Sequence, residues 1–346
     1  MIDADLHNAV PKVEALFPYL DAMWVEYVQQ SAFRGPTDTS YPRGAPSSAR
    51  PDTTPPSGGP PGSDLETLRQ QVLDEGVEIG VLNCLYAVDS IHNPDSAMAL
   101  ARAVNDWQAA EWLEREPRLR ASIVVPSQNP TMAAREIERI GKRKGFVQVL
   151  LPARTHLPLG NRLYHPIFRA AADHDLAVGV HFGGAPGNPP TPTGWHAWYV
   201  EEYVGMAQVM QAQVVSMVAE GLFAEFAGLR VALIEAGWTW MPSLMRRFDQ
   251  DWRDLRRSVP WVKQAPSEYI RDRVRLTLTP THPPPRPGVL AEIVEQMGSD
   301  EMLMYASDYP HLHAERPDEI LGELPKATAR KIRGQNARAF YRLDGR

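Results

Sequence analysis

Apolar and polar residues follow two alternating patterns along most of this chain. Short apolar runs of the kind that form buried β-strands are followed by longer segments with apolar residues at helical spacing. Several runs are apolar throughout, as expected when both faces of a strand are buried. The eight strand-like runs are residues 2–6, 79–85, 120–125, 146–151, 176–181, 230–235, 274–278 and 302–305.

Helical sequence follows each of these runs, and one start signal is especially clear. Ser63, with Glu66 three residues later, has the spacing of a capping box. Strands that alternate with helices in this number predict an α/β fold, a single-domain (β/α)8 TIM barrel over residues 1–346. An open doubly wound sheet is the alternative, but no Gly-x-Gly-x-x-Gly follows any strand. The expected helices cover residues 12–30, 63–75, 93–116, 130–143, 165–174, 204–220, 242–252, 289–297 and 326–341.

Two segments interrupt the alternation. Residues 35–62 consist almost entirely of Pro, Gly, Ser, Thr, Ala and charged residues, so they cannot bury a core of their own. We expect them to form a Pro-rich excursion after the first strand, either a mobile surface loop or a lid that shapes the site. Residues 183–203 follow the fifth strand and form an insertion rich in aromatic side chains.

Composition and charge narrow the range of partners. The net charge is −6, the pI is about 6.0, and no run of Lys and Arg is sustained. Nucleic acids and membrane surfaces are therefore not expected partners, and a small-molecule substrate is. No apolar run approaches the roughly 20 residues that span a bilayer. The single cysteine, Cys84, excludes an internal disulfide and favours a cytoplasmic location.

Polar residues stand where the predicted strands end. The carboxyl ends of barrel strands meet at one rim, which is where the active site of such a barrel lies. Asp5 and His7 lie two residues apart on the first strand, so their side chains share a face. The residues at or just beyond the strand ends are Asp5, His7, Asn83, Arg154, His181, Glu235, Thr279 and Asp308.

Carboxylates and imidazoles at one rim suit a divalent metal with oxygen and nitrogen ligands. Two histidines and three acids (His7, His181, Asp5, Glu235 and Asp308) converge there, and we expect them to form a site for one such ion, with zinc as the first expectation and manganese as the second. The ion would polarise a substrate oxygen and lower the pKa of a bound water. Asp308, beside that water by its position, is the candidate that takes its proton. For Glu235, an ion pair with an arginine such as Arg246 is the alternative.

Candidate substrate-binding aromatics lie near the ends of the fifth and sixth strands. Trp195, His196, Trp198 and Trp238 are placed to wall the mouth of the barrel around an apolar or aromatic substrate. The alternative is that these side chains bury themselves against neighbouring helices or against a partner subunit in a homodimer.

Two further candidates carry positive charge or an imidazole. Arg154, after the fourth strand, is placed to hold a substrate carboxylate, although a surface ion pair explains it equally well. His311 forms a second His-x-His with His313 in the polar loop after the last strand. We expect His311 to contact substrate rather than metal.

Several motifs along the chain together resemble the amidohydrolase superfamily, and within it the amidohydrolase-related branch that includes aminocarboxymuconate semialdehyde decarboxylase. The resemblance rests on IDADLH, RLRASIVVPSQNP, VGVHFGG, LRVALIEAGWTWMPSLMRRFD, PSEYIRDRVRLT, ASDYPH and NARAFYRL. It implies a (β/α)8 barrel with one divalent metal, held by Asp5, His7, His181 and Asp308. Asp5 stands where the superfamily's opening His-x-His has its first histidine, and acid-x-His variants occur in the decarboxylase-like branch. Glu235 stands where decarboxylases of the branch place a catalytic histidine. From the resemblance we expect Glu235 to act there as a general acid/base or to join the metal ligands.

Three functions follow from these residues. The leading hypothesis is a metal-dependent hydrolase that uses metal-activated water on a small organic acid, amide or lactone. The alternative is a non-oxidative decarboxylase of an aromatic or enoic carboxylate. The third is a barrel that has lost its metal and serves as a binding or accessory protein, for which the altered opening motif is the only argument.

Overall fold

The computed structural model describes residues 1–36, 48–184, 189–191 and 193–345. Eight parallel strands lie side by side in sequence order. The sheet closes because Ala4 N donates to Tyr305 O at 2.9 Å and His7 N donates to Tyr309 O at 2.7 Å. The predicted (β/α)8 barrel is therefore confirmed. Its strands are β1 (Ile2–Leu6), β2 (Ile79–Leu82), β3 (Leu119–Val124), β4 (Phe146–Arg154), β5 (Ala177–Gly184), β6 (Val231–Ile234), β7 (Val274–Thr277) and β8 (Leu303–Met304).

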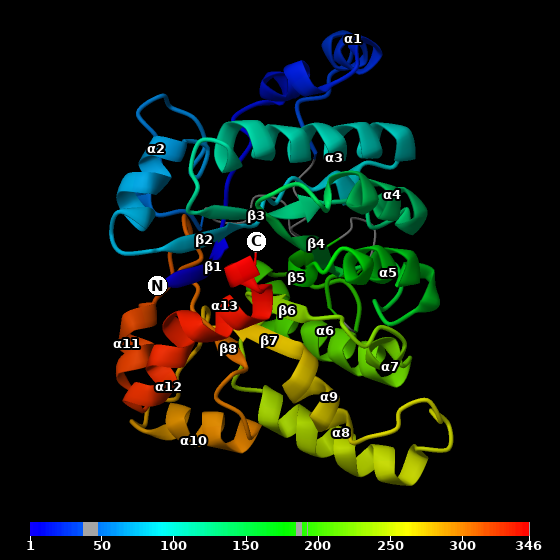
Figure 1. Cartoon of the computed structure of the whole chain (residues 1–346), viewed down its shortest axis with the longest axis vertical. Helices are drawn as coiled ribbons and strands as arrows, with labels where there is room; N and C mark the ends of the chain where they lie inside the picture. The colour runs from blue at the N-terminus through cyan, green and yellow to red at the C-terminus, as the bar shows by residue number, and fades with distance from the viewer. Residues whose placement is uncertain (37–47, 185–188, 192, 346) are drawn as a thin grey trace.

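Helices surround the strands, with α3 to α5 on one side of the barrel and α8 to α10 on the other (Figure 1). The C-terminal helix α13 lies beside the start of β1 (Figure 1), and its Phe340 and Tyr341 share a buried cluster with Ile2 and Ala4. The main helices are α1 (Ala22–Gln30), α2 (Leu65–Leu68), α3 (Pro94–Gln108), α4 (Pro130–Ile140), α5 (His165–Asp173), α6 (Tyr199–Ala219), α7 (Leu222–Glu225), α8 (Met241–Leu255), α9 (Pro266–Arg273), α10 (Val289–Met297), α11 (Pro317–Gly322), α12 (Lys326–Arg330) and α13 (Asn336–Tyr341). No described helix is both long and apolar enough to cross a membrane.

The first two predicted helices differ from the structure. Residues 12–30 form a 3-10 segment, Val13–Tyr19, and then α1, with extended backbone at Leu20 and Asp21 between them. The second helix is capped by Asp64 and not by Ser63, because the Asp64 carboxylate accepts from Thr67 N at 2.7 Å. A carboxylate at this position satisfies a backbone N–H that the first turn leaves without a partner.

Two later helices also depart from expectation. The helix expected from residue 204 begins at Tyr199, where the Glu201 carboxylate accepts from the backbone N–H groups of Ala197 and Trp198 at 3.0 and 2.8 Å. Helix α9 was not predicted, because the charged sequence of Pro266–Arg273 has no clear apolar stripe.

The Pro-rich excursion returns to the barrel beside the loop that follows β8. Residues 37–47 lie outside the described residues, so the expected mobile loop or lid stays a prediction. The backbone N–H of Arg50 donates to Pro310 O at 2.8 Å, and that of Leu312 donates to Ser48 O at 2.6 Å. Ala49 forms an antiparallel bridge with His311. Residues 48–50, in the middle of the excursion, therefore support the loop that carries His311 and His313.

Candidate metal and acid–base site

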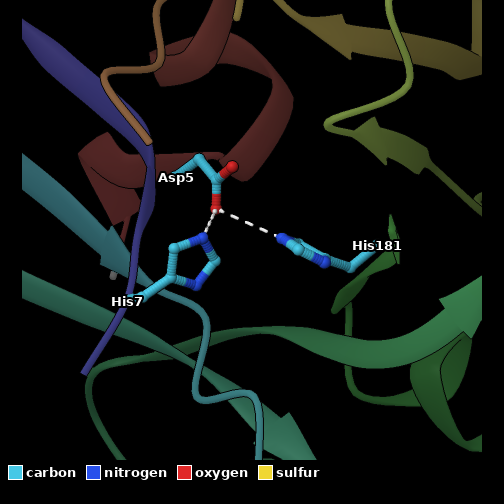
Figure 2. Close-up of side chains that lie close together, drawn as sticks. All are labelled: Asp5, His7 and His181. Atoms are coloured by element: carbon cyan, nitrogen blue, oxygen red, sulfur yellow. Dashed lines mark ion pairs between the residues drawn. The ribbon is translucent and has the colours of Figure 1, made fainter. Parts of the chain in front are cut away.

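Three predicted ligands converge inside the carboxyl end of the barrel. Asp5 lies on β1, His7 follows that strand directly, and His181 lies on β5, with Asp5 between the two imidazoles (Figure 2). Asp5 Oδ1 lies 3.4 Å from His7 Nε2 and 4.0 Å from His181 Nε2. All three side chains are buried, and one ligand atom from each lies within 4.8 Å of the others. The structure therefore brings these three predicted ligands together in one buried cluster.

The polar atoms of this cluster fit a divalent metal. Asp5 Oδ2 and His181 Nε2 are buried and have no hydrogen-bond partner among the described residues. His181 Nδ1 lies 2.7 Å from Phe182 O, and His7 Nδ1 lies 2.8 Å from Asn83 O. Each imidazole therefore donates from Nδ1 to a carbonyl, which directs its Nε2 to the cluster, as in metal-binding histidines. Carboxylate oxygens and imidazole nitrogens suit zinc and manganese alike.

Asp308 borders this cluster and is surrounded by imidazoles. Its Oδ1 lies 2.8 Å from His7 Nε2 and 2.9 Å from His311 Nδ1, and its Oδ2 contacts His313 Nε2. Although burial opposes its ionisation, hydrogen bonds from His311, His313 and His7 hold the pKa of Asp308 well below its usual range. Its backbone φ of 57° is left-handed. For a non-glycine residue, such strain is typical of functional positions.

Glu235 faces the same cluster from the end of β6. Its Oε2 lies 3.5 Å from His181 Nε2, and its Oε1 lies 3.9 Å from His311 Nδ1. Burial, the charge of Asp308 and a hydrogen bond with Asp308 raise the pKa of Glu235 well above its usual range. Two carboxyl groups in contact cannot both ionise easily, and the opposite pKa shifts favour the proton on Glu235 and the charge on Asp308. The alternative pairing with Arg246 is not formed, because Arg246 Nη2 donates to Gln296 Oε1.

The three metal-ligand candidates differ in protonation when no metal is bound. Although burial lowers it, the charges of Asp5 and Asp308 raise the pKa of His7 to about 9. Burial raises the pKa of Asp5 to about 7. Burial and the charge of His7 lower the pKa of His181 to about 3, so this imidazole is neutral. A metal that binds here must displace the proton of His7.

A cavity of about 560 Å³ opens above the cluster. His181, Glu235, His311 and His313 line one part of it, so the metal-ligand and acid–base candidates face a space large enough for a small molecule. Arg34 is the only lysine or arginine among the described lining residues. The rest of the wall is largely aromatic and aliphatic, with Leu85, Tyr86, Val124, Leu150, Leu151, Phe182, Tyr199 and Tyr203.

The aromatic wall is made of residues other than the predicted tryptophans. Trp238 is fully buried in the core, where its Nε1 donates to Thr281 Oγ1 at 3.2 Å. Trp195 and Trp198 are 56% and 73% exposed and are absent from the described cavity lining. Their exposure beside α6 is compatible with the homodimer, which stays a prediction.

Arg154 and His196 both pair with Glu202 and are absent from the described cavity lining. Arg154 Nη2 is 2.8 Å from Glu202 Oε1, and both side chains are buried. His196 Nε2 is 3.8 Å from Glu202 Oε2. The structure therefore places Arg154 in an ion pair, the alternative interpretation, although the pair is buried rather than on the surface.

Three contributors to the site were not selected from the sequence. His313 contacts Asp308, and its i, i+2 spacing from His311 is the sequence signal that points to it. Arg34 and Tyr203 gave no signal, because only the folded chain brings residues before the excursion and within α6 to the same cavity.

Comparison with known proteins gave concordant results. A family model described as "Amidohydrolase" matches residues 2–343. A curated gamma-resorcylate decarboxylase from Rhodococcus jostii is 26% identical over 301 residues, which cover 81% of this chain and 88% of that protein.

Solved structures share the fold over almost the whole chain. The crystal structure of 5-carboxyvanillate decarboxylase from Sphingomonas paucimobilis has a TM-score of 0.73 at 22% identity and covers 99% of this chain and 98% of that one. A dihydroxybenzoic acid decarboxylase from Polaromonas, solved with bound manganese and the inhibitor 2-nitroresorcinol, has a TM-score of 0.67 at 21% identity. The match covers 99% of this chain and 97% of that one.

Proposed function

The chain belongs to the amidohydrolase family, and from this premise and the geometry of the site we propose that it is a metal-dependent, non-oxidative decarboxylase of a small aromatic carboxylic acid. The observation that carries the proposal is that Glu235, close to Asp308 and His181, lines a cavity whose remaining wall is largely aromatic and aliphatic. The decarboxylase relatives support this alternative better than the hydrolase that led from the sequence. The whole barrel, residues 1–346, would act as one domain.

The metal would be held by Asp5, His7, His181 and Asp308. When bound, a divalent ion of this kind supplies a Lewis acid that polarises a substrate oxygen. Manganese is the first candidate because related structures contain it, and zinc suits the same ligands. The unpartnered polar atoms of Asp5 and His181 argue against the metal-free binding protein, because buried polar atoms of this kind need a partner.

Glu235 would supply the proton of the reaction. Replacement of an aryl carboxylate by hydrogen requires one proton at the ring carbon that carries the carboxylate. The Glu235 carboxyl would donate that proton; the carbon–carbon bond then breaks, its electron pair returns to the ring, and carbon dioxide leaves. An ordinary glutamate is ionised at neutral pH, whereas the raised pKa of Glu235 keeps its proton available. Glu235 thus takes the role that the resemblance assigns to a histidine.

The cavity would select the substrate. Its aromatic and aliphatic wall suits a planar ring, and Arg34 is placed to neutralise an acidic substituent of that ring. The substrate class is therefore an aromatic acid, such as a hydroxylated benzoate, rather than a peptide or a sugar.

The direct test is a substrate panel with manganese-loaded protein. Hydroxybenzoates, including 2,6-dihydroxybenzoate and 5-carboxyvanillate, would be followed for carbon dioxide release, beside matched amides, esters and lactones. Release of carbon dioxide from at least one benzoate supports the proposal. Hydrolysis in the second set with no decarboxylation in the first would overturn it in favour of the hydrolase.

A further inference from the structure

Asn83, directly after β2, contacts both Asp5 and His7 of the metal-ligand cluster. Its side-chain Nδ2 donates to Asp5 Oδ1 at 2.9 Å, and its backbone carbonyl accepts from His7 Nδ1 at 2.8 Å. Asn83 itself is fully buried, so no water competes for these bonds. One residue therefore constrains the rotation of a carboxylate and of an imidazole at once.

The orientation of the Asn83 amide is fixed from behind. Its Oδ1 accepts from Ser122 Oγ at 2.6 Å and from Gln148 Nε2 at 3.1 Å. If the amide flipped, its NH2 group would face these two donors, and its oxygen would face the Asp5 carboxylate. Since both contacts are unfavourable, the amide must direct its NH2 group at Asp5.

Gln148 on β4 is fixed in turn by groups across the barrel. Its Nε2 also donates to Ser122 Oγ at 2.9 Å, and its Oε1 accepts from the Tyr341 hydroxyl at 3.1 Å. Gly179 on β5 leaves room for this side chain, because a Cβ there would lie 2.5 Å from Gln148 Nε2 and displace the amide. Each residue in this chain of hydrogen bonds donates to the next: Tyr341 to Gln148, Gln148 to Asn83, and Asn83 to Asp5.

We propose that Asn83, Ser122, Gln148 and Tyr341 form a positioning network that holds Asp5 and His7 in the arrangement that binds the metal. These four residues come from β3, β4, α13 and the end of β2, and all are buried. Hydrogen bonds in a dry interior strengthen one another, so a change at one end of the network reaches the other. Partners of this kind behind metal ligands affect metal affinity by about 10- to 100-fold.

The alternative is that these residues only fill the barrel and satisfy one another. Asn105 offers a matched control, because its buried amide donates to Val124 O at 2.9 Å and to Glu136 Oε1 at 2.8 Å, but not to a metal ligand. Loss of this amide removes buried hydrogen bonds of the same kind without touching Asp5.

The inference rests on the metal-binding part of the proposed function, and its test needs no substrate. Purified metal-free Gln148→Met, Ser122→Ala, Tyr341→Phe and Asn105→Leu would be titrated with Mn²⁺, and free Mn²⁺ would be followed by electron paramagnetic resonance. We expect the dissociation constant to rise about tenfold or more in Gln148→Met, and by smaller factors in Ser122→Ala and Tyr341→Phe. Asn105→Leu should lower the melting temperature but keep the wild-type dissociation constant.

Two results would overturn the inference. One is wild-type Mn²⁺ affinity in a folded Gln148→Met. The other is an equal loss of affinity in Asn105→Leu, which would show a general effect of core damage. Tyr341→Phe removes a single oxygen atom, so it keeps the test decisive if a more drastic variant fails to fold. Absence of decarboxylation would leave this result unaffected, because Mn²⁺ binding is measured alone.

Discussion

Replacement of Glu235 by glutamine tests the assigned proton donor. The amide has the size of the carboxyl group and still donates a hydrogen bond to Asp308, but it has no proton to transfer. Loss of general acid catalysis lowers rates by about 100- to 10,000-fold. At about 1.4 kcal/mol per tenfold, this corresponds to about 3–5 kcal/mol of lost transition-state stabilisation. We expect a loss of this size in kcat/KM for carbon dioxide release.

Metal content separates this role from a role as metal ligand. Glu235→Gln should keep its bound Mn²⁺, whereas Asp308→Asn should lose both Mn²⁺ and activity. Elemental analysis of the two variants, purified in parallel, measures this directly. If Glu235→Gln retained more than about a tenth of the wild-type kcat/KM, the proton would come from another group and the reasoning would fail.

The pH profile gives a second measure of the same residue. Because burial and the charge of Asp308 raise the pKa of Glu235, its carboxyl ionises at a higher pH than an ordinary glutamate. The wild-type rate should therefore fall on the alkaline side, as Glu235 loses its proton. The residual rate of Glu235→Gln should lack this alkaline fall.

Three further predictions follow from the neighbouring groups. Since the pKa of His7 is about 9 without metal, Mn²⁺ binding at pH 8 should release close to one proton, and the Mn²⁺ affinity should rise about tenfold per pH unit up to pH 9. Titration calorimetry in buffers of different ionisation enthalpy measures the number of protons released. A value of zero would contradict this prediction. Arg34→Ala should raise KM for an acidic substrate about tenfold or more with little change in kcat, and an unchanged KM would remove Arg34 from the site. Arg154→Met leaves the Glu202 charge buried without its arginine, so it should lower the free energy of unfolding, measured by urea denaturation, by about 3–5 kcal/mol. A variant of wild-type stability with a raised KM would instead identify Arg154 as a substrate-binding residue.

The barrel could be predicted from the sequence because its signal is local. Each strand is a short apolar run, and the polar residue that ends it lies at the rim by construction. The same rule predicts that Asp5, His7 and His181 lie close together, because the strand ends place the backbone of all three residues at one rim. Asp308 follows the same rule at the last strand.

The cavity wall could not be predicted in this way. An indole near a rim can face inward, outward or into the core, and the local sequence does not distinguish these cases. Trp238 lies in the core, where its Nε1 donates a hydrogen bond to Thr281 Oγ1, whereas Trp198 is exposed at the surface. Tyr203 lies in the first turns of α6, which begins earlier than its apolar pattern suggests, and both Tyr203 and Arg34 line the cavity.

The reaction itself is tested most directly by isotope incorporation from solvent. Manganese-loaded protein would be incubated in deuterated water with the benzoate that it consumes, and the product would be analysed by mass spectrometry and NMR. The proposed decarboxylation predicts carbon dioxide and one deuterium on the ring carbon that carried the carboxylate. A product that keeps its carboxylate, or that gains solvent oxygen at a cleaved amide, ester or lactone, would contradict it.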